Sequence, residues 1–324
     1  MRNKTIDQSR LFAAFLVVVI HAPLPGVIGV AVESVARLAV PFFFMLSGYF
    51  AFGKDKASLK RQISKIFNLF LFAIAINFAG DFLVSLYKGN TFALLAERFS
   101  VSSILKMIVF NNGPLLGHIW FLLALVYVYV IYSSMYSKSR TFVRLAVCLF
   151  LLATLFVLRE ILRAIGVSDI SFYIRNFLVN GIPFFLLGTL AAEYKERLAK
   201  IKPYVWFILG AVGALASIAE RLVLGSCDMY FGTPLLACSF FVASIMDILP
   251  CNNRLAMLGQ KYSRDIYVFH NVVIVVLNAF ALLIGVLQNQ LFLFIRPFVI
   301  VTACIIGLSI LYKILSFKNK AVKD

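Results

Sequence analysis

Apolar stretches of about twenty residues recur along the chain, and this repetition constrains the fold more than any other feature. A helix needs about 20 apolar residues to cross the hydrocarbon core of a bilayer, and 62% of the 324 residues are hydrophobic. Stretches of this length favour membrane helices over barrel strands. We therefore predict an all-α polytopic membrane protein, a bundle of about ten transmembrane helices. The expected spans are about 8–24, 29–52, 66–86, 117–136, 143–160, 171–193, 203–224, 229–249, 263–285 and 291–315.

The net charge of +17 invites a nucleic-acid interpretation. The pattern argues against it, because the basic residues cluster between apolar segments, as they do in cytoplasmic loops. With the N-terminus inside, the Lys and Arg of that side fall near 54–65, 138–144, 195–202, 254–264 and 313–323. The outer side holds only Lys88, Arg98, Lys106, Arg159 and Arg163. We expect both termini to be cytoplasmic, with the lipid bilayer as a partner and no nucleic acid.

One membrane-embedded domain is expected over 1–324, with no appended soluble domain. The five cysteines contain no CxxC pair, which suggests neither a disulfide framework nor a zinc site, and no metal is expected. The sequence HAPLPG after the first apolar segment lacks a small-x-small cleavage site, so that segment does not look like a cleaved signal peptide. The long outer loop, about 87–115, is expected to lie along the membrane interface.

Arg10 and His21 bracket ten apolar residues in the first segment. Eleven helical steps make about three turns, so both side chains share one face, roughly 16 Å apart along the axis. A charge at the bilayer centre costs about 2.5–3.5 kcal/mol on insertion scales, so such residues are functional candidates. The structural alternative is a snorkelling arginine and a histidine that is hydrogen-bonded between helices.

Further ionisable residues are expected in the outer half of the bundle. Glu33 and Arg37 are four residues apart on one helical face, in the favourable order for an ion pair. The others are His118, Arg175, Glu220, Arg221 and Arg296. Because intramembrane charges usually face a bundle interior or water, we favour a polar cavity that opens outward. A network of structural salt bridges is the alternative.

The cytoplasmic half is basic. The rim consists of Arg10, Lys60, Arg61 and Lys65, with Ser47 and Tyr49 at the nearby end of the second segment. Arg and Lys supply charge-assisted donors, which suits a ligand that carries phosphate. The alternative is that these residues only set the membrane topology.

The third histidine, His270, lies in the ninth apolar segment, so all three histidines occur in or at the edge of such segments. A histidine can exchange a proton near neutral pH. The chain has no G-x-S-x-G or HExxH sequence and no Gly-rich phosphate loop. Histidine is therefore the candidate for proton transfer.

Five blocks, in order, resemble the acyltransferase-3 family of membrane O-acyltransferases. The Arg10-x10-His21 pair is similar to the signature of its first helix, and RLAVPFFFMLSGYF (37–50) resembles its second-helix pattern. GHIWFLLAL (117–125) resembles a Gly-His-x-Trp-Phe-Leu helix start. NGIPFFLLGTLAAEY (180–194) and LGQKYSRDIYVFHNVV (258–273) resemble two later blocks. The resemblance covers nearly the whole chain, and it is specific for the family but not for the substrate.

The resemblance implies transfer of an acyl group, usually acetyl, from cytoplasmic acyl-CoA to a hydroxyl of a cell-envelope glycan or lipid-linked sugar. It implies a bacterial cytoplasmic membrane protein that uses acetyl-CoA as a co-substrate and binds no resident cofactor. Two departures stand out: Arg61-x3-Lys65 replaces the family's RxxR, and there is no fused SGNH hydrolase domain. The 37–50 block also resembles the membrane half of vancomycin-resistance serine racemases, which is linked to amino-acid uptake. A small-molecule transporter therefore stays open as the competing class.

In the acyltransferase interpretation, His21 is the general base and Glu33 orients it or an arginine. Arg10, Ser47, Tyr49, Arg61 and Lys65 are assigned to acyl-CoA. The acceptor or the developing oxyanion is assigned to Arg37, His118, Trp120, Arg175, Glu220, Arg221 and His270. A covalent acyl-histidine intermediate is an alternative to direct transfer. The acceptor, the acyl chain and a homo-oligomeric state are left open.

Overall fold

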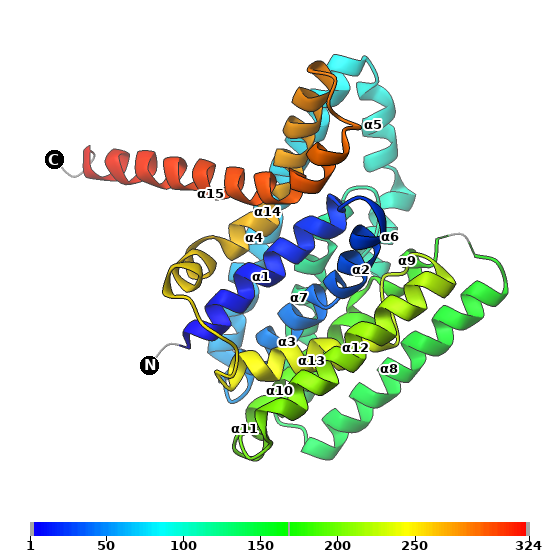
Figure 1. Cartoon of the computed structure of the whole chain (residues 1–324), viewed down its shortest axis with the longest axis vertical. Coiled ribbons are helices and arrows are strands. Elements are labelled where there is room, and N and C mark those ends of the chain that lie inside the picture. The colour runs from blue at the N-terminus through cyan, green and yellow to red at the C-terminus, as the bar shows by residue number, and fades with distance from the viewer. Residues whose placement is uncertain (1–2, 168, 322–324) are drawn as a thin grey trace. The chain divides into compact units, whose positions relative to one another are not determined.

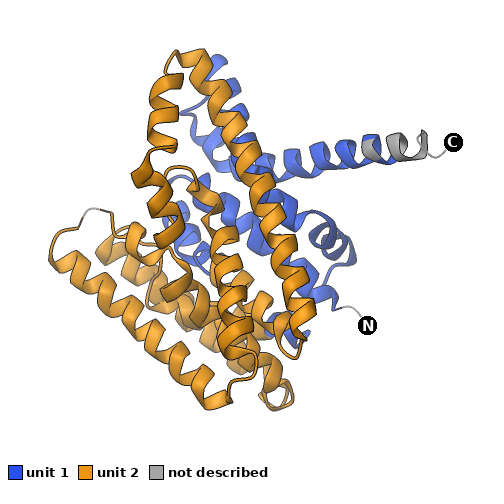
Figure 2. Ribbon diagram, turned by 180° about the vertical axis from the view of Figure 1, so that it is seen from behind, with its two compact units in different colours: residues 1–39, 243–324 blue, residues 40–242 orange. Residues whose placement is uncertain are grey.

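The computed structural model describes residues 3–167 and 169–321. In these residues all regular elements are helical and no strand occurs, which confirms the predicted all-α class (Figure 1). The chain divides into two compact units (Figure 2). Unit 1 contains Met1–Ala39 and Ala243–Asp324, and unit 2 contains Val40–Val242. Each unit is described by itself.

Unit 1 is built from both ends of the chain. Its helices are α1 (Lys4–His21), α2 (Gly26–Ala36), α14 (Asn253–Leu283) and α15 (Gln290–Ala321). The most extensive packing in the unit joins α1 to α14. A Cβ added at Gly259 would lie 1.9 Å from the carbonyl oxygen of Asp7, so the two backbones approach closely only because this residue is glycine.

Hydrogen bonds fix the N-terminal half of α1 within unit 1. The Asn3 side chain caps the helix by accepting from the Ile6 N–H at 2.9 Å. Gln8 donates to the Pro250 carbonyl at 2.8 Å, and its own side-chain oxygen accepts from the Asn252 N–H at 2.6 Å. This part of α1 is therefore anchored to the chain that leads into α14.

Unit 2 holds the central part of the chain, from α3 to most of α13. Its elements are α3 (Ala39–Ala51), α4 (Lys56–Lys88), α5 (Thr91–Arg98), α6 (Val101–Phe110), η1 (Gly117–Ile119), α7 (Trp120–Ile131), η2 (Tyr132–Tyr136), α8 (Thr141–Ala164), α9 (Ser171–Ile174), η3 (Phe177–Gly181), α10 (Ile182–Glu193), α11 (Lys195–Leu198), α12 (Pro203–Leu224) and α13 (Gly232–Ile245).

Small residues let the helices of unit 2 pack closely. A Cβ added at Gly48 on α3 would lie 1.9 Å from the carbonyl oxygen of Phe185, and one added at Gly188 on α10 would lie 1.9 Å from that of Met45. Helices in a membrane associate through such close contacts because lipid provides little hydrophobic driving force between them. The α3–α10 contact therefore depends on glycine from both helices.

The longest helix of unit 2, α4, has a defined signal at each end. Asp55 accepts from the Ser58 N–H at 3.2 Å, and hydrogen bonds from Ser58 lower the pKa of this exposed carboxyl below its ordinary value. Gly89, with φ of 69°, ends the helix in the left-handed conformation that glycine adopts readily. Beyond it, the expected outer loop forms α5 and α6, and Arg98 pairs with Asp81 at 2.8 Å.

Seven helices in the described residues are long and apolar enough to cross a membrane, which indicates a multi-pass membrane protein. They are Gly26–Ala51, Lys56–Lys88, Gly117–Tyr136, Thr141–Ala164, Pro203–Leu224, Asn253–Leu283 and Gln290–Ile314. Two other predicted spans lie on the shorter apolar helices Phe177–Glu193 and Gly232–Ile245, and the first lies on α1, which carries Lys4, Asp7 and Arg10. The count of about ten spans and the cytoplasmic termini are not confirmed.

Candidate functional site

Arg10 and His21 lie on one uninterrupted helix, α1, as their spacing predicted. The Arg10 guanidinium pairs with Asp7, one turn earlier, at 3.3 Å. Asp7 is 5% exposed at its side chain, whereas Arg10 is 29% exposed. The Asp7 carboxylate is thus the buried member of this ion pair. Asp7 was not among the residues expected at the site, although an acid three residues before an arginine is a signal for such a pair.

His21 is the last residue of α1, and it lies beside His270 of α14. The two ring centroids are 5.2 Å apart, with 40° between the ring planes. His21 is exposed, whereas His270 is fully buried. The Nδ1 atom of His270 lies 2.8 Å from the Tyr267 carbonyl oxygen and 3.2 Å from that of Ile266. Two of the three histidines therefore form one cluster in unit 1.

Glu33 and Arg37 form the ion pair that their spacing predicted. Arg37 Nη2 lies 2.6 Å from Glu33 Oε1, and both side chains are largely buried. Arg37 also caps the C-terminus of α2, where the second predicted span is interrupted before α3 begins at Ala39. Non-helical backbone at membrane depth is tolerated where protein or water satisfies its polar groups. Elsewhere in unit 1, Arg296 donates to the Pro23 carbonyl at 3.5 Å.

The residues assigned to the donor in unit 2 lie on α3 and α4. The Ser47 hydroxyl donates to the Phe43 carbonyl at 2.8 Å, and the Tyr49 ring meets Phe241 edge-on. Arg61 and Lys65 are exposed and one turn apart on α4, and Arg61 donates to the Ser58 hydroxyl at 2.8 Å. The two cations can therefore meet a phosphate, while the Ser47 hydroxyl bonds its own helix.

The residues assigned to the acceptor in unit 2 fall on several elements. His118 lies on η1, and Trp120 begins α7, where its carbonyl accepts from the Asn111 side chain at 3.0 Å. Arg175 pairs with Asp228 at 2.5 Å. Arg221 lies in the last turn of α12, next to Glu220.

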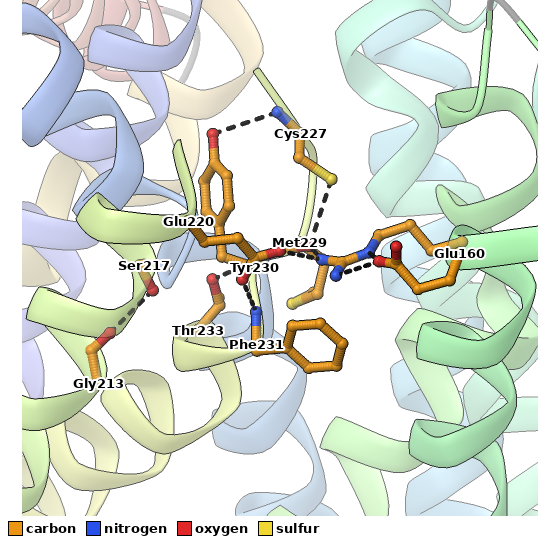
Figure 3. Close-up of polar contacts among 10 residues, drawn as sticks. Glu160, Gly213, Ser217, Glu220, Cys227, Met229, Tyr230, Phe231 and Thr233 are labelled. Carbon is orange, nitrogen blue, oxygen red and sulfur yellow. Dashed lines mark hydrogen bonds and ion pairs between the residues drawn. The ribbon is translucent and has the colours of Figure 1, made fainter. Parts of the chain in front are cut away.

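Glu220 belongs to a buried network around Arg159 of α8. The Arg159 side chain is fully buried and lies 2.7 Å from Glu220 Oε1, 2.5 Å from Glu160 Oε1 and 2.6 Å from the Met229 carbonyl oxygen. The other Glu220 oxygen accepts from the Phe231 N–H at 2.6 Å, and the Phe231 ring covers the guanidinium at 4.4 Å. Figure 3 shows Glu160, Glu220, Met229 and Phe231 in this network.

From the sequence, Arg159 was expected only to lie on the outer side of the membrane. In the structure Arg159 lies on α8, where its buried guanidinium is the centre of a group of ion pairs. One oxygen of Glu220 pairs with this guanidinium, and the other accepts from the Phe231 N–H. The contacts of Glu220 therefore agree with the alternative expectation, a network of structural salt bridges in the outer half of the bundle. Among the described residues, no group of three or more His, Cys, Asp or Glu side chains is placed to hold a metal ion.

Residues 3–313 match the family model described as an acyltransferase domain. Over 336 aligned residues the chain is 25% identical to an amino-acid racemase of Enterococcus faecalis, covering 94% of this chain and 45% of that protein. Over 240 residues it is 27% identical to a serine/alanine racemase of Enterococcus gallinarum, covering 68% of this chain and 33% of that protein. The chain thus spans less than half the length of these relatives, and no solved structure matches it. From the family match over nearly its full length, the chain belongs to the acyltransferase-3 family of membrane acyltransferases.

Proposed function

We propose that this protein moves an acetyl group from cytoplasmic acetyl-CoA to a hydroxyl of a cell-envelope glycan or lipid-linked sugar, across a bacterial cytoplasmic membrane. The observation that carries the proposal is the histidine at the end of α1, in contact with a second, buried imidazole. Together with membership of an acyltransferase family, this cluster supports proton transfer during acyl transfer.

In this proposal His21 takes the proton of the acceptor hydroxyl as that oxygen attacks the thioester carbonyl. The carbon–sulfur bond then breaks, the acetyl ester forms, and the proton leaves with the thiol of coenzyme A. An arginine stabilises the oxyanion, and Arg37, Arg175 and Arg221 are the candidates. Glu33 already holds Arg37 at 2.6 Å, so it keeps that guanidinium in place.

The donor side of the proposal rests on the basic residues. The proposal assigns Arg10 of unit 1, and Arg61 and Lys65 of unit 2 together with Ser47 and Tyr49, to the phosphate-bearing part of coenzyme A, because Arg and Lys supply charge-assisted donors. It also requires about ten spans with both termini in the cytoplasm, so that the Arg10 end of α1 faces the donor and the His21 end faces the acceptor.

The test supplies radiolabelled acetyl-CoA to nanodisc-embedded protein together with a lipid and glycan extract of bacterial envelopes. The expected result is protein-dependent release of free coenzyme A and label in the extract. Protein that neither binds nor cleaves acetyl-CoA would contradict the proposal. Heat-inactivated protein in the same nanodiscs is the control.

A second candidate is transport of an amino acid. It is favoured by the similarity to a serine/alanine racemase, most of whose sequence lies outside the matched region, because the 37–50 block resembles the membrane half of such racemases, which is linked to amino-acid uptake. A transporter needs the same polar core but no thioester chemistry. Uptake of labelled serine or alanine by proteoliposomes, with no effect of acetyl-CoA, would favour this candidate.

Replacing Arg10 by alanine should weaken acetyl-CoA binding about tenfold or more, because one charge-assisted hydrogen bond contributes about 1.5–3 kcal/mol. Arg10→Lys should restore the affinity only in part, since lysine keeps the charge but loses the bidentate fork. Calorimetric titration of acetyl-CoA in detergent measures both effects. Lys88→Ala, at an exposed position of α4 on the expected outer side, is the control. Equal affinity in wild type and Arg10→Ala would remove Arg10 from the donor site.

The proposed topology predicts which positions react with a membrane-impermeant thiol reagent. The labels must be placed in a cysteine-free background, because Cys251 is exposed. Cysteines at Pro25 and Asn289 should react in intact cells, and those at Lys56 and Lys320 only after permeabilisation, because Lys and Arg collect on the cytoplasmic side. Reaction of the Pro25 position only after permeabilisation would invert the topology and remove the main physical support for an envelope acceptor.

A further inference from the structure

The contact between His21 and His270 points to a role for His270 that differs from the acceptor or oxyanion role expected from the sequence. The two rings come from α1 and α14, the most extensively packed helix pair of unit 1. Their centroids are 5.2 Å apart. Each imidazole nitrogen lies about 1.2 Å from its ring centre, so rings this close bring an N–H···N hydrogen bond of about 2.9 Å within reach of a rotation of the exposed His21 side chain.

The backbone of α14 determines which nitrogen of His270 carries the proton. Nδ1 lies 2.8 Å from the Tyr267 carbonyl oxygen and 3.2 Å from the Ile266 carbonyl oxygen. A carbonyl oxygen only accepts, so Nδ1 must donate an N–H to it. In the neutral ring, the lone pair is then on Nε2. His270 is therefore held by its own helix in the tautomer that accepts a hydrogen bond at Nε2.

The position of His21 suits the donor of a hydrogen bond to His270 Nε2. It lies in the last turn of α1, where the helix ends at Ala22. The carbonyl groups at a helix C-terminus stabilise positive charge on a histidine. This end of α1 therefore suits a ring that becomes positively charged when it takes a proton during the reaction, with His270 as the hydrogen-bond acceptor.

We propose that His270 is a positioning residue for His21. Its Nε2 accepts an N–H from the His21 ring, so the other nitrogen of His21 faces the acceptor hydroxyl as the base. When His21 takes the proton of that hydroxyl, the same hydrogen bond stabilises the imidazolium. A carboxylate has this function beside the histidine of a catalytic triad. The inference rests on the proposed function, since it assumes that His21 is the base.

Three replacements of His270 separate positioning from packing. Glutamine places an amide oxygen near the Nε2 position, asparagine places its amide near Nδ1, and leucine fills the space with no polar atom. If His270 acts through Nε2, His270→Leu and His270→Asn should lower kcat for acetyl transfer from acetyl-CoA at least about tenfold, whereas His270→Gln keeps most of it. KM for acetyl-CoA should be unchanged in all three, because in this proposal His270 acts on His21 and not on the donor.

Asn278→Leu is the matched control, since it makes the same kind of replacement eight residues later on α14 and should leave kcat unchanged. A merely structural role for His270 predicts a different pattern, in which Gln and Asn are equally active. Equal kcat in the Gln and Asn variants, or wild-type kcat in the Leu variant, would overturn the proposal.

A second measurement needs no acceptor and separates this inference from the proposed function. Nitrogen-15 NMR of histidine-labelled protein in nanodiscs distinguishes protonated from unprotonated ring nitrogens. We expect one fixed tautomer of His21 in wild type and exchange-averaged nitrogens in His270→Leu. Unchanged His21 signals in that variant would refute the pairing. If these NMR changes are seen but the wild-type protein transfers no acetyl group, the proposed function is refuted, and the pairing of the two histidines is not.

Discussion

His21→Ala is expected to lower acyl transfer by about 10²–10⁴-fold, the usual contribution of a general base. The residue ends α1 and is exposed, so removing its ring leaves no buried cavity in the core of unit 1. The variant should therefore fold and insert like wild type. The loss should appear in kcat, because the ring acts on the acceptor proton and not on the donor.

The measurement compares acetyl transfer to envelope material by wild type and variant at equal amounts of monodisperse protein. Acetyl-CoA affinity, measured by calorimetry, is the internal control, and it should be the same in both proteins. Phe12→Ala, at another exposed position of α1, controls for a general effect of truncating a side chain on this helix. Near-normal transfer by a stably expressed His21→Ala variant would exclude the base role.

Local contacts were the part of the site that the sequence could predict. Arg10 and His21 share a face because α1 is continuous, and Glu33 meets Arg37 because residues four apart on a helix are neighbours. The break after Arg37 also had a signal. Pro41 has no N–H to donate to the Arg37 carbonyl, four residues earlier, so it favours an interruption there.

Contacts between distant segments had no such signal. The sequence places His21 and His270 in apolar segments, but only the packing of α1 on α14 shows that their rings meet. The partner of Glu220 was missed for the same reason, since hydropathy gives the depth of a residue and not its neighbours. Arg159 therefore looked like one of several charges near the outer surface.

Replacing Arg159 by methionine should destabilise unit 2 strongly. The guanidinium is fully buried, and its partner Glu220 is 9% exposed. Removing one member of a buried ion pair typically costs about 3–5 kcal/mol, because the remaining charge is left desolvated. The stacking of Arg159 on Phe231 and its hydrogen bond to the Met229 carbonyl are lost as well. Thermal unfolding in detergent should show a midpoint lower by about 5–10 °C.

The two glutamates around Arg159 provide the matched comparison. Glu160 is 45% exposed, so Glu160→Gln should have an effect of about 1 kcal/mol or less, whereas Glu220→Gln leaves Arg159 buried beside a neutral partner. The double variant Arg159→Met, Glu220→Gln should recover part of the loss of Arg159→Met, because no uncompensated carboxylate remains. Equal unfolding midpoints for Glu160→Gln and Glu220→Gln would show that burial does not set the strength of these pairs. A double variant no more stable than Arg159→Met would show that the lost packing, and not the stranded charge, is what destabilises the protein.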